Sequence, residues 1–482
     1  MRGTARTGPT VDAAYPSEEE RDIVLRSGST LRLRPIRPQD AGQLLAFYRR
    51  LSPDSLYFRF FSLPNVDADR AAGFCRVDYD NDFALVGETA GRIVAVAHYF
   101  RLARSPERAE VAFTVEDALQ GQGVGTRLLE RLAEIARAHG ITTFEAEVLG
   151  HNRRMIDVFR NCGFETQERQ IESGVERIGL SIGSTAAFEE HAAERSSRAA
   201  FASMQRLFEP SVVAVVGASR ERGKIGAEIF FNLNGVFRGK TVPINPRADA
   251  IDGVRCYPRL VDVPGPVDLA VIAVPAGHVE AAIDDCVAKG VSGITVITAG
   301  FSETGDAGRR KEAVLLDKVR AAGIRMIGPN CMGLVNTDPR FRLNATFAPI
   351  YPPEGRVALS SQSGALGLAL LDYASKLNLG ISTFVSVGNK ADVSGNDLIQ
   401  YWSEDPRTDV ILLYLESFGN PIRFSKIARR VARRKPIVAV KSGRSRAGSR
   451  AASSHTGALA ESDRVVDALF RQAGVIRTNT LE

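Results

Sequence analysis

The chain has 482 residues, enough for about three domains, and its 44% hydrophobic and 24% charged content is ordinary for a globular protein. Its apolar runs are far shorter than the roughly 20 residues of a membrane span, and its start lacks the apolar core of a signal peptide. The net charge of +6 is not gathered in long basic runs, which argues against nucleic acid as a ligand. Five scattered cysteines, none spaced Cys-x-x-Cys, indicate a reducing compartment and no metal site. Composition therefore predicts a soluble, cytoplasmic protein.

Apolar patterning predicts several segments along the chain. Residues 21–182 mix strand and helix patterns, and the segment that follows is small, polar and alanine-rich, as in a linker or tether helix. Farther on, continuous Val, Ile and Leu runs such as Val212–Val216 and Val410–Leu415 alternate with amphipathic stretches, which is typical of buried parallel strands. The pair Pro352-Pro353 divides this α/β region. The predicted parts are a disordered tail (1–20), a first domain (21–182), a linker (183–203), a second domain (204–352) and a third (353–482).

A glycine-rich turn is the clearest phosphate-binding pattern in the first domain. The predicted strand Ala109–Val115 is followed by Gln120–Thr126 (QGQGVGT) and then by a helix with apolar residues at i, i+3 and i+4 spacing. Glycines at three alternate positions remove side chains that would hold the backbone away from a pyrophosphate. The first N–H groups of the helix and its dipole then favour an anion.

Together with its neighbours, this turn resembles motif A of the GNAT acyltransferases. Asn152–Phe164 (NRRMIDVFRNCGF) is similar to the next helix of that family, and Arg32–Arg37 and Leu51–Phe61 resemble the opening of its bacterial protein lysine acetyltransferases. The resemblance implies a GNAT fold with a mixed sheet, and direct transfer from acetyl-CoA in a ternary complex. The acetyl-CoA-binding residues that it implies are Phe113, Val115, Gln120, Gly121, Gln122, Gly123, Val124, Gly125, Thr126 and Asn152.

Glu110 is the predicted general base. A lysine amine with a pKa of about 10.4 is protonated at neutral pH, so exposing its lone pair costs about 4–5 kcal/mol. Glu110 begins the strand among apolar neighbours that would raise its pKa, and the family's general-base Glu lies in the same strand. The alternatives are a solvated strand-end Glu110 and a second candidate, Glu116, on the same side. Many relatives carry a tyrosine as thiolate acid where this chain has Phe159, so the thiolate leaves unassisted or another group protonates it.

A second glycine turn follows the predicted strand Val212–Val216. Its spacing is not Gly-x-Gly-x-x-Gly, so NAD is not favoured. With Pro243–Arg247, Asp268–Pro275 and Ile327–Gly333, the turn resembles the Rossmann-like CoA-binding domain of the NDP-forming acyl-CoA synthetases, relatives of the succinyl-CoA synthetase α subunit. The residues that this resemblance places around CoA or acyl-CoA are Gly217, Ala218, Ser219, Arg220, Arg247, Val274 and Pro275.

The resemblance continues through the third domain, which it implies is a flavodoxin-like ligase domain, truncated at its end or naturally short. Ser360–Gly364 opens a helix after a strand, and Ser454–Ala458 (SHTGA) is similar to the family's phosphohistidine loop. It implies that His455 accepts phosphate between helix N-termini and that Glu416 orients its imidazole. The family's ATP-grasp domain is not in this sequence, so ATP-driven ligation requires a separate chain.

The combination resembles bacterial Pat-type protein lysine acetyltransferases over residues 21–482. Our first hypothesis is an acetyl-CoA-dependent protein lysine N-acetyltransferase that acts on metabolic enzymes such as AMP-forming acyl-CoA synthetases, with the synthetase-like body binding acyl-CoA as a regulatory region. The alternatives are the α-type half of an ADP-forming acyl-CoA synthetase with a separate ATP-grasp chain, and a non-catalytic acyl-CoA-sensing scaffold. We expect a protein substrate as the partner and no binding to nucleic acid or to a membrane. The sequence is also compatible with homo-oligomerisation.

Overall fold

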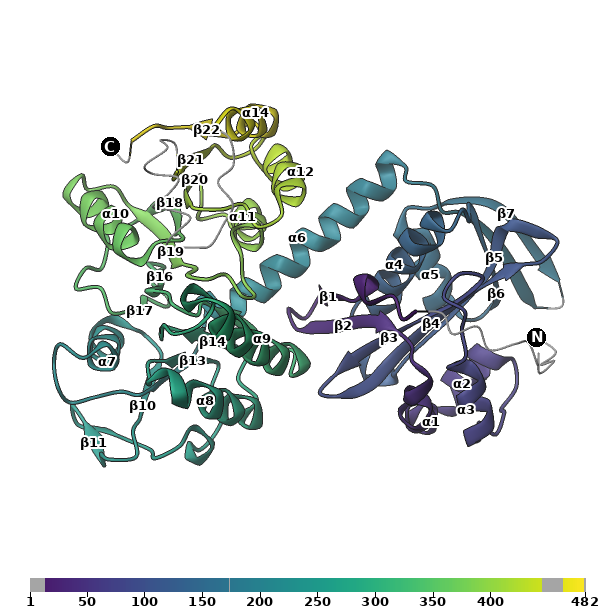
Figure 1. The fold of residues 1–482 in the computed structure, drawn as a ribbon, viewed down its shortest axis with the longest axis horizontal. Helices are drawn as coiled ribbons and strands as arrows, with labels where there is room; N and C mark the ends of the chain where they lie inside the picture. The colour runs from purple at the N-terminus through teal and green to yellow at the C-terminus, as the bar shows by residue number, and fades with distance from the viewer. Residues whose placement is uncertain (1–13, 173, 444–462, 481–482) are drawn as a thin grey trace. The chain divides into compact units, whose positions relative to one another are not determined.

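The computed structural model describes residues 14–172, 174–443 and 463–480 (Figure 1). The chain divides into two compact units, the first of residues 1–196 with 321–323 and the second of residues 197–320 with 324–482. Helix α6 (Ala186–Phe208) is continuous through most of the predicted linker. No helix in the described ranges is long and apolar enough to cross a membrane.

The first unit is built on an eight-stranded mixed sheet with the order β1-β2-β3-β4-β5-β6-β8-β7. Its neighbouring strands are antiparallel except β5 and β6, which are parallel. The strands are β1 (Arg21–Val24), β2 (Thr30–Pro35), β3 (Asp82–Thr89), β4 (Arg92–Leu102), β5 (Ser105–Val115), β6 (Thr143–Leu149), β7 (Glu165–Glu172) and β8 (Val175–Ser181). The helices are α1 (Ala41–Arg50), α2 (Pro53–Phe60), α3 (Ala68–Phe74), α4 (Val124–Ala138) and α5 (Arg153–Cys162).

Two apolar cores cover the two faces of this sheet. Helices α4 and α5 pack on one face, where the apolar stripe of α4 that includes Leu128, Leu132 and Ile135 is buried. Helices α1 and α3 pack on the other face through residues such as Phe47 and Ala71. At the N-terminal end of the described chain, Ser17–Glu19 form a 3₁₀ turn within the segment predicted as a tail.

The second unit begins with a five-stranded parallel sheet with the order β10-β9-β13-β14-β15. The chain moves from β9 to one side and later returns to the other side at β13, so the strand order reverses between β9 and β13. The strands are β9 (Val212–Val216), β10 (Lys240–Ile244), β13 (Leu269–Ile272), β14 (Gly293–Val296) and β15 (Arg325–Ile327), beside a small ribbon of β11 (Ala250–Ile251) and β12 (Val254–Arg255). The helices are α7 (Ile225–Val236), α8 (Ala276–Lys289) and α9 (Asp306–Ala321).

A seven-stranded sheet with the order β17-β16-β19-β18-β20-β21-β22 completes this unit. Strands β18 to β22 are parallel, whereas β16 runs antiparallel to both β19 and β17. The strands are β16 (Gly333–Asn336), β17 (Leu343–Thr346), β18 (Glu354–Ser361), β19 (Ile381–Ser386), β20 (Val410–Leu415), β21 (Ile437–Lys441) and β22 (Ile476–Arg477). The helices are α10 (Gly364–Lys376), α11 (Gly395–Glu404), α12 (Pro421–Val431) and α14 (Asp463–Ala473). Strands β16 and β17 precede the Pro352-Pro353 pair but belong to the sheet that follows it.

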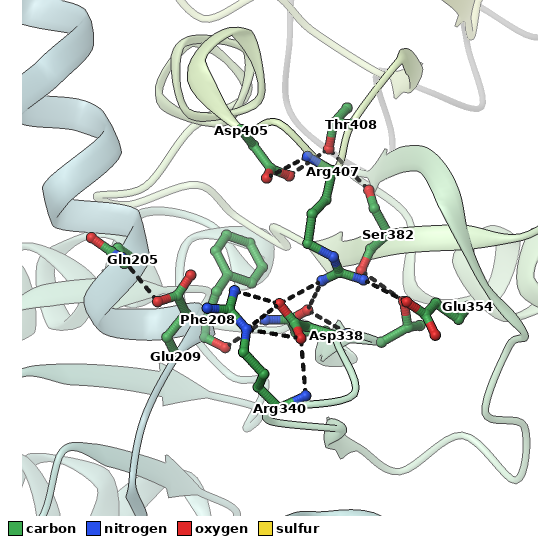
Figure 2. Close-up of polar contacts among 12 residues, drawn as sticks. Gln205, Phe208, Glu209, Asp338, Arg340, Glu354, Ser382, Asp405, Arg407 and Thr408 are labelled. Carbon is green, nitrogen blue, oxygen red and sulfur yellow. Dashed lines mark hydrogen bonds and ion pairs between the residues drawn. The ribbon is translucent and has the colours of Figure 1, made fainter.

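A polar cluster around Asp338 joins the end of helix α6 to this second sheet (Figure 2). Asp338 is only 4% exposed, and its carboxylate accepts hydrogen bonds from Arg340 and lies 3.2 Å from an amino group of Arg407. The Asn336 amide donates to the Phe208 carbonyl oxygen (2.9 Å) and accepts from Arg407 (3.1 Å). Because a buried charge is costly without partners, these contacts hold the C-terminal end of α6 in one position on the sheet.

Candidate active sites

Strands β5 and β6 separate in the middle of the first sheet. They pair only where Arg108–Glu110 lie beside Thr143–Glu145, after which β5 continues along β4 and β6 continues along β8. Val111–Val115 therefore have no strand partner on the β6 side within the described chain. Apart from the Val115 carbonyl oxygen, which accepts from the Gln120 side chain, backbone groups on this side can hold an extended ligand by strand-like hydrogen bonds.

The glycine-rich turn lies at the end of β5 and leads directly into α4. Gly121 and Gly123 have φ angles of +76° and +88°, in the left-handed region that favours glycine. A Cβ atom at Gly121 would meet no other atom within 4 Å, and at Gly123 the nearest atoms belong to the Arg26 side chain, at 3.7 Å. The N-terminal end of α4 is thus little covered by protein, as the binding of a pyrophosphate there requires.

Several of the residues predicted to bind the cofactor have side chains that make structural contacts. The Gln120 amide donates to the Val115 carbonyl oxygen (3.1 Å) and to Ser55 (3.0 Å), which fixes the turn against β5. The Asn152 side chain accepts from the Met155 N–H group (3.2 Å) and caps α5. The side chains of Phe113, Val124 and Thr126 are buried. Contact of these positions with acetyl-CoA, through their backbone groups, stays a prediction.

Glu110 is the last residue of β5 that pairs with β6, and it lies on the same face of the sheet as Glu145 and Glu147. Arg108 pairs with Glu145 (2.6 Å) and Arg177 pairs with Glu147 (2.6 Å). The Glu110 carboxylate has no hydrogen bond or ion pair with the described part of the chain. Burial, assisted by the charge of Glu147, raises the pKa of Glu110. A half-buried carboxylate with a raised pKa and no fixed partner is suited to accept a proton.

The other two positions singled out near this strand have different roles. Glu116 lies 3.3 Å from Arg50 and 3.6 Å from Arg92, so its charge is already neutralised. Phe159 is buried and packs edge-to-face on Phe113, with ring centroids 5.8 Å apart. These contacts favour Glu110 over Glu116 as the base and leave an apolar ring where many relatives carry a thiolate acid.

The second glycine turn lies at the carboxyl edge of the five-stranded sheet, where the strand order reverses. The loops after β9, β10 and β13 carry the seven predicted CoA-binding residues, and all three strands end at this edge. A Cβ atom at Gly217 would lie 2.5 Å from the Ala273 oxygen, and one at Gly226 would lie 2.0 Å from the Gly217 oxygen. Glycine at 226 therefore lets α7 begin directly against the turn, and glycine at 217 lets the turn approach the loop after β13. The Asn245 amide donates to the Ala218 oxygen (2.7 Å) and ties two of the loops together.

The seven-stranded sheet has a similar reversal between β18 and β20. Gln362 follows β18, and its side-chain oxygen accepts from the N–H groups of Glu416 (2.8 Å) and Ser417 (2.9 Å), which follow β20. Lys390, in the loop after β19, donates to the same oxygen (3.2 Å). His455 lies outside the described residues, so its position beside Glu416 stays a prediction.

Gln362 lies within the predicted helix start Ser360–Gly364 but was given no role of its own, and Lys390 was not predicted from the sequence. A polar residue directly after each of the buried strands β18 and β20 could have indicated Gln362 beside Glu416, since parallel strands bring such residues to one edge. Lys390 lies farther along the loop after β19, so this signal does not reach it. No group of three or more metal-ligating side chains occurs in the described ranges.

Comparison with known families assigns each of these domains. Residues 47–164 match the acetyltransferase (GNAT) family, residues 211–337 match a CoA-binding domain, and residues 354–482 match the succinyl-CoA ligase-like flavodoxin domain.

Individual relatives each cover only part of the chain. The α subunit of acetate–CoA ligase [ADP-forming] II from Pyrococcus furiosus is 43% identical over 57% of this chain and 60% of its own length. The dinucleotide-forming acetyl-coenzyme A synthetase 1 of Candidatus Korarchaeum cryptofilum, solved with phosphate and ADP, is 45% identical over 57% of this chain and 60% of that chain, with a TM-score of 0.55. The acetyltransferase Pat of Mycolicibacterium smegmatis is 32% identical over 29% of this chain and 43% of its own length. The chain thus spans less than two thirds of each.

The ligase relatives match more of the chain, and at higher identity, than the acetyltransferase Pat does. The matches therefore support the ligase alternative better than the acetyltransferase hypothesis. The matched ligases are mostly archaeal, so they do not confirm the resemblance to bacterial Pat-type enzymes. The chain combines a GNAT acetyltransferase domain with a CoA-binding domain and a succinyl-CoA ligase-like flavodoxin domain, the last two forming a body like the α part of the ADP-forming acyl-CoA ligases.

Proposed function

We propose that the chain carries two CoA-dependent activities, one in each unit. The ligase-like body acts as the α-type half of an ADP-forming acyl-CoA ligase, together with a separate ATP-grasp chain. The observation that carries this proposal is the position of Glu416, whose backbone is held by Gln362 where the strand order reverses. The identity of more than 40% to ADP-forming acetate–CoA ligases over this body supports it.

The proposed ligase chemistry passes a phosphoryl group between His455 and the carboxylate of an acid. The carboxylate oxygen forms a bond to phosphorus as the bond from phosphorus to the imidazole nitrogen breaks, which gives an acyl phosphate. The CoA thiol, losing its proton, then attacks the acyl carbon, and phosphate leaves. Glu416 holds the imidazole in one tautomer so that the other ring nitrogen is available.

The reverse phosphoryl transfer tests this activity without the ATP-grasp chain. The intact chain is incubated with acetyl phosphate labelled on phosphorus, and acid-labile label on the protein is measured. We expect label on the wild type, none on His455→Ala and less on Glu416→Gln. Equal label on wild type and His455→Ala would contradict the proposal.

The second activity is acyl transfer from acetyl-CoA to an amine at the GNAT domain, with a protein lysine as the acceptor. The observation that carries it is Glu110, a half-buried carboxylate without a partner in the described chain, at the separation of β5 and β6. Glu110 takes the proton of the ammonium group, the free amine attacks the thioester carbonyl, and the carbon–sulfur bond breaks to release the CoA thiolate.

An AMP-forming acetyl-CoA synthetase serves as the test acceptor, because the resemblance to Pat-type enzymes points to such targets. With acetyl-labelled acetyl-CoA and no ATP, we expect label on a lysine of the acceptor with the wild type and almost none with Glu110→Gln. Release of CoA thiol without label on any lysine would point to hydrolysis and would remove the protein acceptor from the proposal. In this account the ligase-like body also regulates transfer by binding acyl-CoA.

A further inference from the structure

The N-terminal end of helix α4 has no side-chain cap and no acidic partner in the described chain. The N-cap residue Gly123 makes no side-chain cap hydrogen bond, and the first turn of α4 contains no acidic residue. The carboxylate of Asp117, three residues before the glycine-rich turn, accepts hydrogen bonds from Ser52 and Ser55 instead. The first N–H groups of α4 and the positive end of its dipole are therefore available to an anion that the protein does not supply.

Arg26, in the turn between β1 and β2, lies against this end of the helix. Its backbone N–H group donates to the Gln122 oxygen (3.3 Å), and its side-chain Cγ and Nε atoms lie 3.7 Å from the place of a Cβ atom at Gly123. The side chain is exposed, and its guanidinium group has no hydrogen bond or ion pair with the described residues. By contrast, Arg127 in the first turn of α4 pairs with Glu130 (3.0 Å). Arg26 therefore brings a positive charge to the glycine-rich turn that no described carboxylate neutralises.

Arg154 brings a second guanidinium group to the same turn from helix α5. It donates to the Gln120 side-chain oxygen (2.7 Å) and has no carboxylate partner in the described chain. Arg153 and Arg154 both lie in the first turn of α5, which has no acidic residue, although the positive end of a helix dipole disfavours cations there. Since α4 and α5 follow the parallel strands β5 and β6, both helices begin at the same edge of the sheet. An anion bound there would offset the unfavourable charge at the start of α5.

A pyrophosphate matches this arrangement in charge and in shape. Its two phosphate groups carry two negative charges, one for each of the guanidinium groups of Arg26 and Arg154, and a guanidinium fork binds two phosphate oxygens at once. The turn itself leaves room, because a Cβ atom at Gly121 would meet no other atom within 4 Å. An anion with a single charge would leave one of the two guanidinium groups without a partner.

We propose that Arg26 and Arg154, which we name the arginine clamp, bind the pyrophosphate of acetyl-CoA at the glycine-rich turn. The inference rests on the proposed acyl transfer and deepens it, because it names two residues outside that turn that select the donor. With the clamp, the GNAT domain favours a thioester of CoA, which carries a pyrophosphate, over a thioester of pantetheine, which carries none. The β1–β2 turn thereby takes part in binding the donor.

Hydrogen exchange of the intact chain, measured on a peptide that covers residues 120–130, tests the proposal. Bound donor should slow exchange at the start of α4, so the acetyl-CoA concentration at half protection reports this site and not the CoA site of the ligase-like body. Arg26→Met and Arg154→Met should each raise that concentration at least about tenfold, because the pyrophosphate loses a charge-assisted contact. The matched control Arg104→Met removes an exposed arginine from the turn between β4 and β5, at the other end of β5, and should keep the wild-type value.

Two shortened donors assign the contact to the pyrophosphate. The donor 3′-dephospho-acetyl-CoA keeps the pyrophosphate, so Arg26→Met should weaken its binding by the same factor as that of acetyl-CoA. The donor S-acetylpantetheine carries no phosphate group, so wild type and Arg26→Met should respond to it equally. Arg26→Lys keeps the charge but loses the fork of the guanidinium group, and it should fall between wild type and Arg26→Met.

Three results would overturn the proposal: no protection of the turn by acetyl-CoA in wild type, equal half-protection concentrations in wild type and Arg26→Met, or a loss in Arg26→Met that disappears with the dephospho donor, which would place the 3′-phosphate at Arg26. The proposed acyl transfer is tested separately by label on a lysine acceptor. Protection that depends on Arg26 without any label transfer would contradict acyl transfer and keep the arginine clamp. Label transfer without protection that depends on Arg26 would contradict the clamp alone.

Discussion

Glu110 is suited to act as a base because the arginines near it form ion pairs with other carboxylates. Arg108 and Arg177 pair with Glu145 and Glu147, two other carboxylates on the same face, and Glu110 is left with a raised pKa. The sequence predicted Glu110 from its place in the strand and from the family resemblance. It could not predict which of several carboxylates stays unpaired, because that depends on which strand lies beside β5.

Glu110→Gln should lower kcat for acetyl transfer by about 10²–10⁴-fold, because the acceptor ammonium group loses the group that takes its proton. The affinity for acetyl-CoA should change little, since the site proposed for the pyrophosphate is the glycine turn and not Glu110. Steady-state kinetics with titration of acetyl-CoA measure both quantities. Equal turnover by wild type and variant at pH 7 would exclude Glu110 as the base.

The rate of transfer should also depend on the ionisation of Glu110. The carboxylate must be deprotonated to act, so kcat/KM should rise with pH through a pKa above the usual value of about 4.3. Glu110→Gln should lose this acidic limb, whereas Glu116→Gln should keep it. A limb retained in Glu110→Gln would assign it to another group.

The raised pKa of Glu110 also affects folding stability, which should fall as pH rises, whereas the rate of transfer rises. Since the folded protein disfavours the ionised form, the stability gained from the protonated form is lost as pH rises through the folded pKa. Glu110→Gln should therefore unfold at the same or a higher urea concentration at pH 7. A marked loss of stability would assign Glu110 a structural role.

Among elements, the buried strands were the most predictable. The sequence runs Val212–Val216 and Val410–Leu415 form β9 and β20 with the same bounds, because continuous Val, Ile and Leu runs suit strands covered on both faces. Strands β16 and β17 were not predicted to join the later sheet. Strand β16 pairs with β19, which lies farther along the chain, and β17 pairs with β16. The prolines that follow β17 therefore mark a connection rather than a division between sheets.

The start of helix α7 depends on glycine at one position. A Cβ atom at Gly226 would overlap the Gly217 oxygen, so Gly226→Ala should push the helix away from the turn, destabilise the protein by about 1–3 kcal/mol and weaken CoA binding to this body. Gly235→Ala lies in the same helix with no atom within 4 Å and should stabilise it by about 0.5–1 kcal/mol. Urea unfolding and CoA titration compare the two, and equal effects would contradict the close contact at Gly226.

At the scale of the second unit, the Asp338 cluster fixes helix α6 to the sheet (Figure 2). Asp338→Ala should destabilise this unit by about 2–4 kcal/mol, less than the roughly 3–5 kcal/mol for fully buried pairs because Arg407 is partly exposed. Arg340→Ala, at an exposed side chain, should cost less than about 1 kcal/mol. Similar losses of stability in the two variants would show that the buried Asp338 carboxylate contributes no more to stability than the exposed Arg340 side chain.

The same cluster predicts a loss of stability in acid. Burial by itself would raise the pKa of Asp338, but the hydrogen bonds from Arg340 and the charge of Arg407 outweigh burial and lower it. The stabilisation is therefore present above the unfolded pKa of about 3.9 and is lost as pH falls through the lower folded pKa. Asp338→Asn should flatten this part of the pH–stability curve, and an unchanged curve would contradict the assignment.

For the whole molecule, the central claim is that two separate CoA-dependent sites occupy one chain. The most direct measurement compares wild type, Glu110→Gln and His455→Ala in two transfers: acetyl label from acetyl-CoA to a lysine acceptor, and phosphoryl label from acetyl phosphate to the chain. The account predicts that Glu110→Gln loses only the first transfer and His455→Ala loses only the second. Loss of both transfers in either variant, or of neither, would contradict it.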